Sequence, residues 1–439
     1  MLEVAPNLNG SQSNALQIYL KQLNWSISGF ARRVHQRCQV IGLSNTVSPS
    51  TVSRWCRGKT VPGPELCAAA CHVLSSALHQ IVTPESLGWS AASEDIAAES
   101  LEYSGLAHAV RILGKLWELD FLCKHNNIQR MFFAVTFDSA SREALVMPPD
   151  LDLSGHGHRK VSTADVELLK HHTHLYGKLD ALHGSGKFRS VFAGFMDAHT
   201  TELLHGSFST QLGRKLYGSV ADAVLTMASM AYDDQLPGLA QRYDLQAMRL
   251  AQAIGDRSRI TRAHIHHARL AAAHGERKCA LTHARSAVLA SAGAPPLVKA
   301  YAAVTEARAW AFNGQPSQTS AAVARARDAL NRAGSTDPGW LSWLDRSELE
   351  RQAAWALAVA GLSVPGMDAL HEALNVPSDH RRANVELLIT AAELARLRGD
   401  LAEHASLAKR AEDASRPLMS RRLAARVKLL VSGQPLDDF

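Results

Sequence analysis

The residues best suited to chemistry lie between positions 48 and 59, in a short segment that reads Ser-Pro-Ser-Thr-Val-Ser-Arg-Trp-Cys-Arg-Gly-Lys. An arginine guanidinium can donate two hydrogen bonds to O6 and N7 of a guanine, and serine and threonine hydroxyls can contact base edges or phosphates. The chemistry indicated is therefore recognition of double-stranded DNA. The candidate residues are Ser48, Pro49, Ser50, Thr51, Ser53, Arg54, Arg57 and Lys59.

Local signals predict that this segment is a short helix. Ser48 is a suitable N-cap, because its hydroxyl can accept a hydrogen bond from a free amide of the first turn. Pro49 follows at the first helical position, where its missing N–H costs nothing. Gly58 stands where a left-handed C-cap is expected. Three apolar residues recur at i, i+3 and i+4 and give the helix one narrow buried face: Val52, Trp55 and Cys56.

A second helix is predicted just before this segment, from Ser26 to Val34, on the periodicity of its apolar residues. Together, residues 28–34 and 48–59 resemble the helix-turn-helix of lambda-type phage repressors. The resemblance implies that Pro49, Ser50 and Arg54 read base edges, and that Ser28, Ser48 and Lys59 contact phosphates. The thirteen residues from 35 to 47 replace the tight turn of that family. A longer second helix followed by a loop through residues 42–45 would accommodate them.

The charge distribution agrees with a polyanion-binding N-terminal domain. Residues 1–93 contain seven Lys and Arg against three acidic residues, whereas the other 346 residues contain 40 basic and 38 acidic ones. Between Ser26 and Gly63 there are six basic residues and no acidic one. A basic patch confined to one small domain is typical of nucleic-acid binding.

The six cysteines do not form the framework of a disulfide-rich secreted domain. Four of them lie in or near the predicted DNA-binding unit: Cys38, Cys56, Cys67 and Cys71. A zinc site or a thiol switch is one interpretation, but packing as small apolar residues is the interpretation we favour. The sequence shows neither a signal peptide nor an apolar run long enough to span a bilayer. We therefore expect a cytoplasmic, nucleoid-associated protein with no membrane partner.

Beyond position 210 the sequence repeats a unit of two Ala-rich helices joined by a short loop. The loops are predicted near Gln235, Gly275, Gly314, Gly361 and Gly399. Small residues that would let paired helices approach closely are Ala240, Ala247, Ala280, Ala287, Gly366, Ala373, Ala405, Ala408 and Ala411. The pattern resembles degenerate tetratricopeptide repeats, with a spacing of 38 to 47 residues against about 34 in the standard repeat. A plain Ala-rich bundle is the structural alternative.

The expected fold is therefore all-α. It comprises a flexible arm (1–13), a lambda-repressor-like helix-turn-helix domain (14–90), a helical linker and dimerisation region (91–210), and a tetratricopeptide-like superhelix (211–439). This order resembles a large group of actinobacterial transcriptional regulators. The resemblance extends through Leu113–Trp117, Met230–Asp233 and Gly238–Tyr243.

Other chemistry finds less support in the sequence. Histidine pairs occur at positions 156 and 158, 171 and 174, and 264 and 267, but no further ligand follows at a diagnostic spacing and no His-Glu-x-x-His is present. We therefore expect solvated or packing histidines, with no metal and no cofactor. No Gly-x-Ser-x-Gly elbow occurs, and we find no nucleophile with its base. The sequence gives no reason to expect an enzyme.

The function predicted is a sequence-specific transcriptional regulator that binds a palindromic operator as a homodimer. Two surfaces are expected to offer an apolar seam for pairing: the repeats themselves, and one helical face that carries Leu113, Leu116, Trp117 and Phe121. The concave face of the repeats is expected to sense a small molecule or a peptide. The alternative is a helical-repeat scaffold that binds a protein partner and carries a DNA-binding domain without sequence preference.

Overall fold

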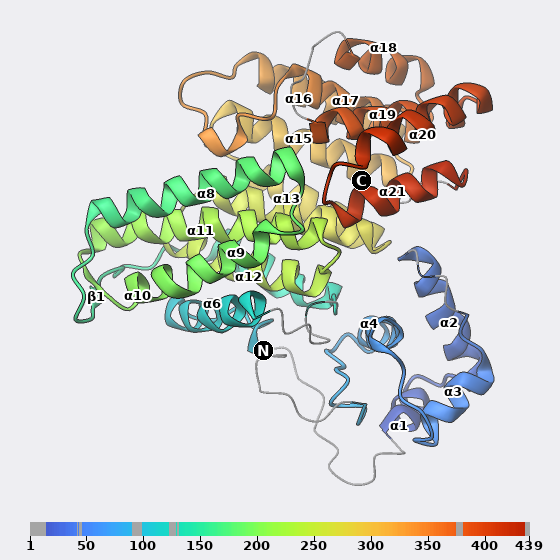
Figure 1. The fold of residues 1–439 in the computed structure, drawn as a ribbon, viewed down its shortest axis with the longest axis horizontal. Coiled ribbons are helices and arrows are strands. Elements are labelled where there is room, and N and C mark those ends of the chain that lie inside the picture. Colours follow the sequence, from blue (N-terminus) through green and yellow to red (C-terminus); the bar gives the residue numbers. More distant parts are fainter. Residues whose placement is uncertain are drawn as a thin grey trace.

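The computed structural model describes residues 15–41, 43, 46–89, 99–122, 129, 131–374 and 381–434. The predicted arm and three of the four loop residues at 42–45 lie outside these ranges. Within them the fold is all-α, as predicted, and the only strands are two residues long (Figure 1). No helix in the described part is both long enough and apolar enough to cross a bilayer.

Four helices form the N-terminal domain: α1 (Ala15–Gln22), α2 (Ile27–Val40), α3 (Pro49–Cys56) and α4 (Pro64–Leu78). The predicted second helix is longer than its apolar pattern suggested, because it continues six residues beyond Val34. The first six of the thirteen residues from 35 to 47 are therefore helical. Phe30, Val34 and Val52 are fully buried where α2, α3 and α4 meet.

A layer of helices connects this domain to the repeats. It comprises α6 (Leu106–Phe121), the 3-10 turn η2 (Ala134–Thr136), α7 (Phe137–Val146), α8 (Thr163–His183), α9 (Phe188–Phe195), the π-helical turn η3 (Met196–Thr200) and α10 (Thr201–Leu204). The strands β1 (Gly155–His156) and β2 (Ser207–Phe208) pair antiparallel. Ser162 and Asp165 form a reciprocal capping box that begins the long helix α8.

The C-terminal half consists of five antiparallel helix pairs and one closing helix. The pairs are α11 (Thr210–Asp233) with α12 (Pro237–Ala253), α13 (Arg257–Ala273) with α14 (Arg277–Ala290), α15 (Pro296–Phe312) with α16 (Pro316–Asn331), α17 (Arg346–Val359) with α18 (Ser363–Leu374), and α19 (Arg381–Leu397) with α20 (Leu401–Ser415). A short 3-10 turn, η4 (Gly339–Leu341), precedes α17, and α21 (Arg421–Val431) ends the array. The first helices of successive pairs contact one another, which gives the superhelical stacking.

The predicted loops and most of the predicted small residues occupy the expected places. Gln235, Gly275, Gly314, Gly361 and Gly399 all have positive φ, between 58° and 83°, which lets each first helix end abruptly. All the predicted small residues are buried between paired helices except one, because Ala405 faces solvent.

The predicted pairing face of residues 113–121 is covered within the chain. Leu113, Leu116 and Trp117 are at most 1% exposed, because α6 packs against α9 and α12. Of the four residues only Phe121 is exposed, at 51%. The assignment of this face to dimerisation was therefore wrong: its apolar side chains form core between the connecting layer and the repeats.

The first and last repeats are joined to each other. Helix α8 packs against both α11 and α19, and α21 contacts α11 (Figure 1). A buried polar cluster ties this junction, in which Arg382 of α19 pairs with Asp233 of α11 and with Asp180 of α8, the latter at 3.0 Å. Ser420, the N-cap of α21, donates a 2.7 Å hydrogen bond to Asp233. The array is thus closed into a compact body.

Candidate nucleic-acid interface

Helix α3 has the cap predicted from its sequence. The Ser48 hydroxyl accepts a hydrogen bond from the amide of Thr51 at 3.2 Å and lies 2.8 Å from the hydroxyl of Ser50. Pro49 occupies the first helical position. Gly58 has a φ of 64° and ends the helix in the left-handed region. The hydroxyls are thereby gathered around the N-terminal end of α3.

The opposite face of α3 anchors the helix in the domain core. Val52, Trp55 and Cys56 are at most 4% exposed, as predicted. The Trp55 ring meets Trp89 edge to face, with centroids 5.7 Å apart. Such pairs stabilise a fold beyond the burial of their area. The orientation of α3 is therefore fixed by Trp55, whose indole is buried on the face of the helix opposite the candidate DNA-contacting residues.

The candidate residues outside that core are accessible. Ser28, Pro49, Ser50, Arg54, Arg57 and Lys59 are exposed, and Ser48, Thr51 and Ser53 are partly exposed. Arg57 folds back along the helix and donates a 2.6 Å hydrogen bond to the hydroxyl of Ser53. Eight of the nine predicted residues lie on α3 or its flanking turns, and Ser28 lies in the first turn of α2. The structure thus presents one short helix with hydroxyls at one end and basic residues at the other.

One of the six basic residues counted in this region has another role. Arg37 is only 8% exposed, and its guanidinium donates a hydrogen bond to the carbonyl oxygen of His274 in the loop between α13 and α14. Burial lowers the pKa of Arg37 to about 10. The other five basic residues between Ser26 and Gly63 are exposed. One of them, Arg33, lies over the ring of Trp25 at 4.1 Å.

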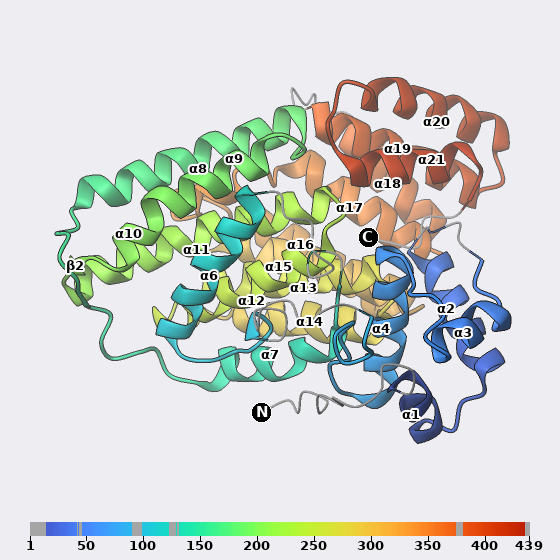
Figure 2. The ribbon, with the colours of Figure 1, turned by 60° about the horizontal axis from the view of Figure 1, so that its bottom comes forward.

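The N-terminal domain docks on the repeats through α2 and α4, leaving α3 at the outer edge of the molecule (Figure 2). Besides the Arg37 contact, the Nε2 atom of His72 lies 2.9 Å from a carboxylate oxygen of Glu276. The Nδ1 atom of His72 lies 3.0 Å from the carbonyl oxygen of Phe132. Sequence reasoning missed this docking site, because its residues are about 200 positions apart and belong to no local motif.

The four cysteines near the motif behave as core residues. Cys38, Cys56, Cys67 and Cys71 are all free and buried. Burial raises the pKa of the Cys38, Cys56 and Cys71 thiols, which disfavours the thiolate needed for redox or metal chemistry. These properties support the packing interpretation over a thiol switch.

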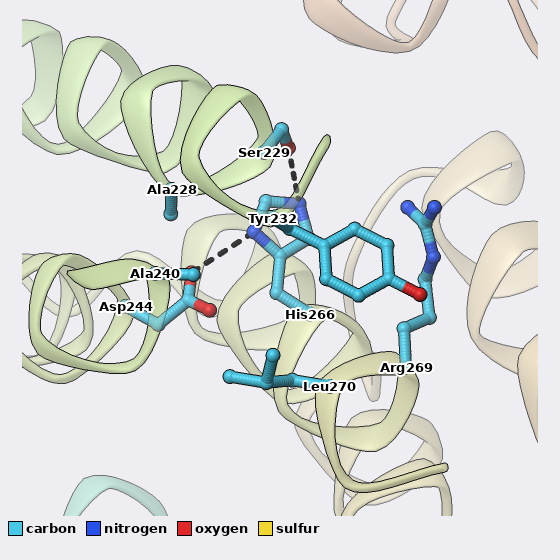
Figure 3. A pocket seen from close by; sticks show the side chains of 8 residues that line it. All are labelled: Ala228, Ser229, Tyr232, Ala240, Asp244, His266, Arg269 and Leu270. Atoms are coloured by element: carbon cyan, nitrogen blue, oxygen red, sulfur yellow. Dashed lines mark hydrogen bonds and ion pairs between the residues drawn. The ribbon is translucent and has the colours of Figure 1, made fainter. Parts of the chain in front are cut away.

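A second polar site lies inside the repeats, between α11, α12 and α13 (Figure 3). His266 is held there by Asp244, 2.9 Å from Nδ1, and by the Ser229 hydroxyl, 3.3 Å from Nε2. The Arg269 guanidinium lies over the Tyr232 ring at 5.3 Å. The cavity volume of the hollow is about 10 Å³. Because typical small-molecule sites span roughly 300–1,000 Å³, this hollow is small for a ligand site.

The comparison with protein families found one similarity. Residues 16–90 match a family described as the SP15 N-terminal domain, a range that contains α1 to α4 and the turn after them. No curated protein matches the chain. The matched family is not one of the lambda-repressor-like helix-turn-helix families. The interpretation of α3 as a DNA-reading helix therefore depends on its residues and their geometry.

Proposed function

We propose that the protein is a transcriptional regulator that binds double-stranded DNA sequence-specifically through α3. The observation that carries the proposal is the two-sided character of this helix. One side is anchored by Trp55, and the other exposes hydroxyls and arginines to solvent. A rigidly held helix of this kind fits the major groove, where each base pair presents a distinct set of donors and acceptors.

The proposal assigns base recognition chiefly to Arg54. Its exposed guanidinium lies two residues before the end of α3, with no acidic residue nearby in the sequence. A bidentate contact to guanine contributes about 1–3 kcal/mol of discrimination against other bases. Ser28, Ser48 and Lys59 would hold the domain on the phosphates, in a way that favours no particular sequence.

The test is selection of binding sites from a random duplex library with the full chain, followed by titration of the selected and scrambled duplexes. Arg54→Ala should reduce the preference for the selected site about 5-fold or more, in line with the loss of one bidentate contact. Arg332→Ala is the matched control, because it removes the same charge from an exposed side chain at the end of α16. If the wild-type chain binds all duplexes equally, the scaffold alternative replaces this proposal.

We propose that the regulator pairs through α8, because the face first predicted is buried. Three leucines spaced seven residues apart on this helix remain 40–50% exposed: Leu168, Leu175 and Leu182. A seven-residue spacing keeps apolar side chains on one seam of two associating helices. The spacing therefore favours a second copy of α8, related by a twofold axis, as the occupant of this stripe. A dimer of this kind would bind a palindromic operator.

An effector site in the interior of the superhelix completes the proposal. Four arginines gather there from four helices: Arg269 of α13, Arg308 of α15, Arg351 of α17 and Arg426 of α21. Burial, followed by repulsion from the other three arginines, lowers the pKa of Arg308 to about 9. Two of the four pair with carboxylates, Arg351 with Glu348 and Arg426 with Glu386, both at 2.5 Å. The proposed effector, an anionic small molecule or an acidic peptide, would therefore be bound mainly by Arg308 and Arg269. Citrate, used as a probe, should raise the melting temperature of the wild-type chain and not that of Arg308→Met.

A further inference from the structure

Three histidines converge in the buried core between α13 and α14. His264 and His267 lie one turn apart on α13, and His283 faces them from α14. One ring nitrogen from each lies within 4.8 Å of the corresponding nitrogens of the other two. All three side chains are fully buried. Among the described residues, this is the one group of three or more potential ligands close enough to share a metal ion.

Hydrogen bonding within the chain does not explain the histidine at position 264. Both ring nitrogens of His264 are buried and have no hydrogen-bond partner. A neutral imidazole carries one donor and one acceptor, and burying either without a partner costs free energy. A leucine of similar size would fill this position without that cost. A histidine at position 264 is therefore best explained if its ring binds a ligand, such as a metal ion.

The protonation state of the three rings suits metal binding. Burial lowers the pKa of His264 and His267 well below the usual value, with a further decrease from the neighbouring histidines. Burial also lowers the pKa of His283, to about 3. At neutral pH all three rings are neutral, which is the form that coordinates a metal.

One histidine is also oriented in the way that metal ligands are. The Nδ1 atom of His283 lies 3.1 Å from the hydroxyl of Ser141 on α7. Ligating histidines commonly use their second nitrogen in such a bond, which fixes the ring orientation. Nε2 is then the atom of His283 that would bind the ion.

We propose that His264, His267 and His283 bind a divalent transition-metal ion, with Zn²⁺ as the best match. Imidazole nitrogens suit zinc, copper and nickel, whereas calcium and magnesium prefer oxygen ligands. In a tetrahedral zinc site, nitrogens about 2.0–2.1 Å from the metal lie roughly 3.3 Å from one another. The three nitrogens, now within 4.8 Å of one another, would have to move closer by side-chain rotation to reach this geometry. The inference is independent of the proposed DNA binding.

The position of the cluster gives the ion a structural consequence. The loop that joins α13 to α14 contacts the N-terminal domain. Its His274 carbonyl oxygen accepts a hydrogen bond from Arg37, and its Glu276 carboxylate pairs with His72. An ion held by both helices would fix them relative to each other. It would therefore stabilise the surface on which the N-terminal domain docks.

The experiment measures metal binding by the full chain after treatment with a chelator. Titration calorimetry with Zn²⁺ and visible absorption with Co²⁺ should both show one ion per chain, and Zn²⁺ should raise the melting temperature. His264→Leu should abolish both binding signals while folding at least as well as the wild type without metal. Replacement of the exposed pair, His171→Ala with His174→Ala on α8, controls for ions bound at the surface and should leave the stoichiometry unchanged.

A second variant keeps the test decisive if His264→Leu fails to fold. Ser141→Ala retains all three ligands and removes only the bond that orients His283. It should weaken Zn²⁺ binding about 10- to 100-fold, as is typical for such outer-shell partners. Absence of one-to-one binding by the wild-type chain would overturn the proposal. Binding that persists in His264→Leu but disappears in the α8 double variant would overturn it as well.

Discussion

Mild acid should destabilise this protein through histidines of its repeats, most of which are buried while His274 is partly exposed. For five of them burial is the main cause that lowers the pKa, and the residues are His264, His266, His267, His274 and His283. In the unfolded chain the same rings have pKa values of about 6.5. The unfolded state therefore takes up protons between the two pKa values and the folded state does not. Stability is full above about pH 6.5 and is lost as the pH falls below it.

The magnitude follows from the same linkage. At pH 5.5, one unit below the unfolded pKa, a ring that stays neutral in the fold reduces the free energy of unfolding by about 1.4 kcal/mol relative to alkaline pH. His283, whose pKa burial lowers to about 3, accounts for about this amount. The pKa values of the other four rings are lowered too, so we expect the total loss of stability between pH 7.5 and pH 5.5 to exceed about 1.4 kcal/mol.

Urea unfolding followed by circular dichroism at pH 7.5, 6.5 and 5.5 measures the effect, with EDTA present so that metal binding does not contribute. His283→Leu removes one titrating ring and should retain about 1.4 kcal/mol of the stability that the wild type loses at pH 5.5. His171→Ala, at an exposed position of α8, is the matched control and should follow the wild type. Equal stability of the wild type at pH 7.5 and 5.5 would refute the reasoning.

Three further substitutions test the anchor, the docking site and the pairing face. Trp55→Ala removes a buried indole and should lower the free energy of unfolding by about 3–5 kcal/mol. Limited proteolysis should then cut residues 15–89 while the repeats persist. An unshifted melting curve would mean that this indole contributes little to stability. Gly275→Ala forces a left-handed alanine whose Cβ would meet Val40 of α2 at 2.7 Å, and should increase hydrogen exchange in α2. Its control is Gly314→Ala, which has the same backbone strain with no atom within 4 Å and should leave exchange in α2 unchanged. Leu175→Glu should convert a dimer to a monomer in sedimentation, and a variant that sediments like the wild type would exclude the α8 stripe.

Features encoded within a few neighbouring residues could be predicted from the sequence. The N-cap serine, the proline after it and the glycine at the end define α3 without reference to the rest of the chain. The glycines of the repeat loops were found in the same way, because a left-handed residue after a helix has a local cause. Even here tertiary packing changed one boundary, since α2 extends to Val40 where its apolar face packs on α4.

Features formed by distant residues could not be predicted in the same way. His264 and His267 were visible as a pair, but their third partner, His283, lies on the next helix, and nothing at a fixed spacing marks it. The docking contact between Arg37 and His274 likewise joins residues far apart in the sequence, with no spacing that marks them as partners. The sequence analysis counted Arg37 among the six basic residues of the predicted patch, whereas in the structure its side chain is buried at the domain interface.

The two apolar stripes show why the pairing face could not be predicted from periodicity alone, and they lead to a last prediction. Apolar periodicity in a sequence predicts that a helix face is buried, but it does not identify the element that covers it. The apolar face of α6 is covered by α9 and α12, whereas the leucines of α8 remain exposed. In both views α8 and α3 lie at opposite ends of the molecule (Figures 1 and 2). A twofold axis beside α8, between the two copies of this helix, would therefore hold the two α3 helices far apart. We expect footprinting to show half-sites separated by at least two helical turns, each about 34 Å. Half-sites one turn apart would require a pairing face close to α3 and would contradict pairing through α8.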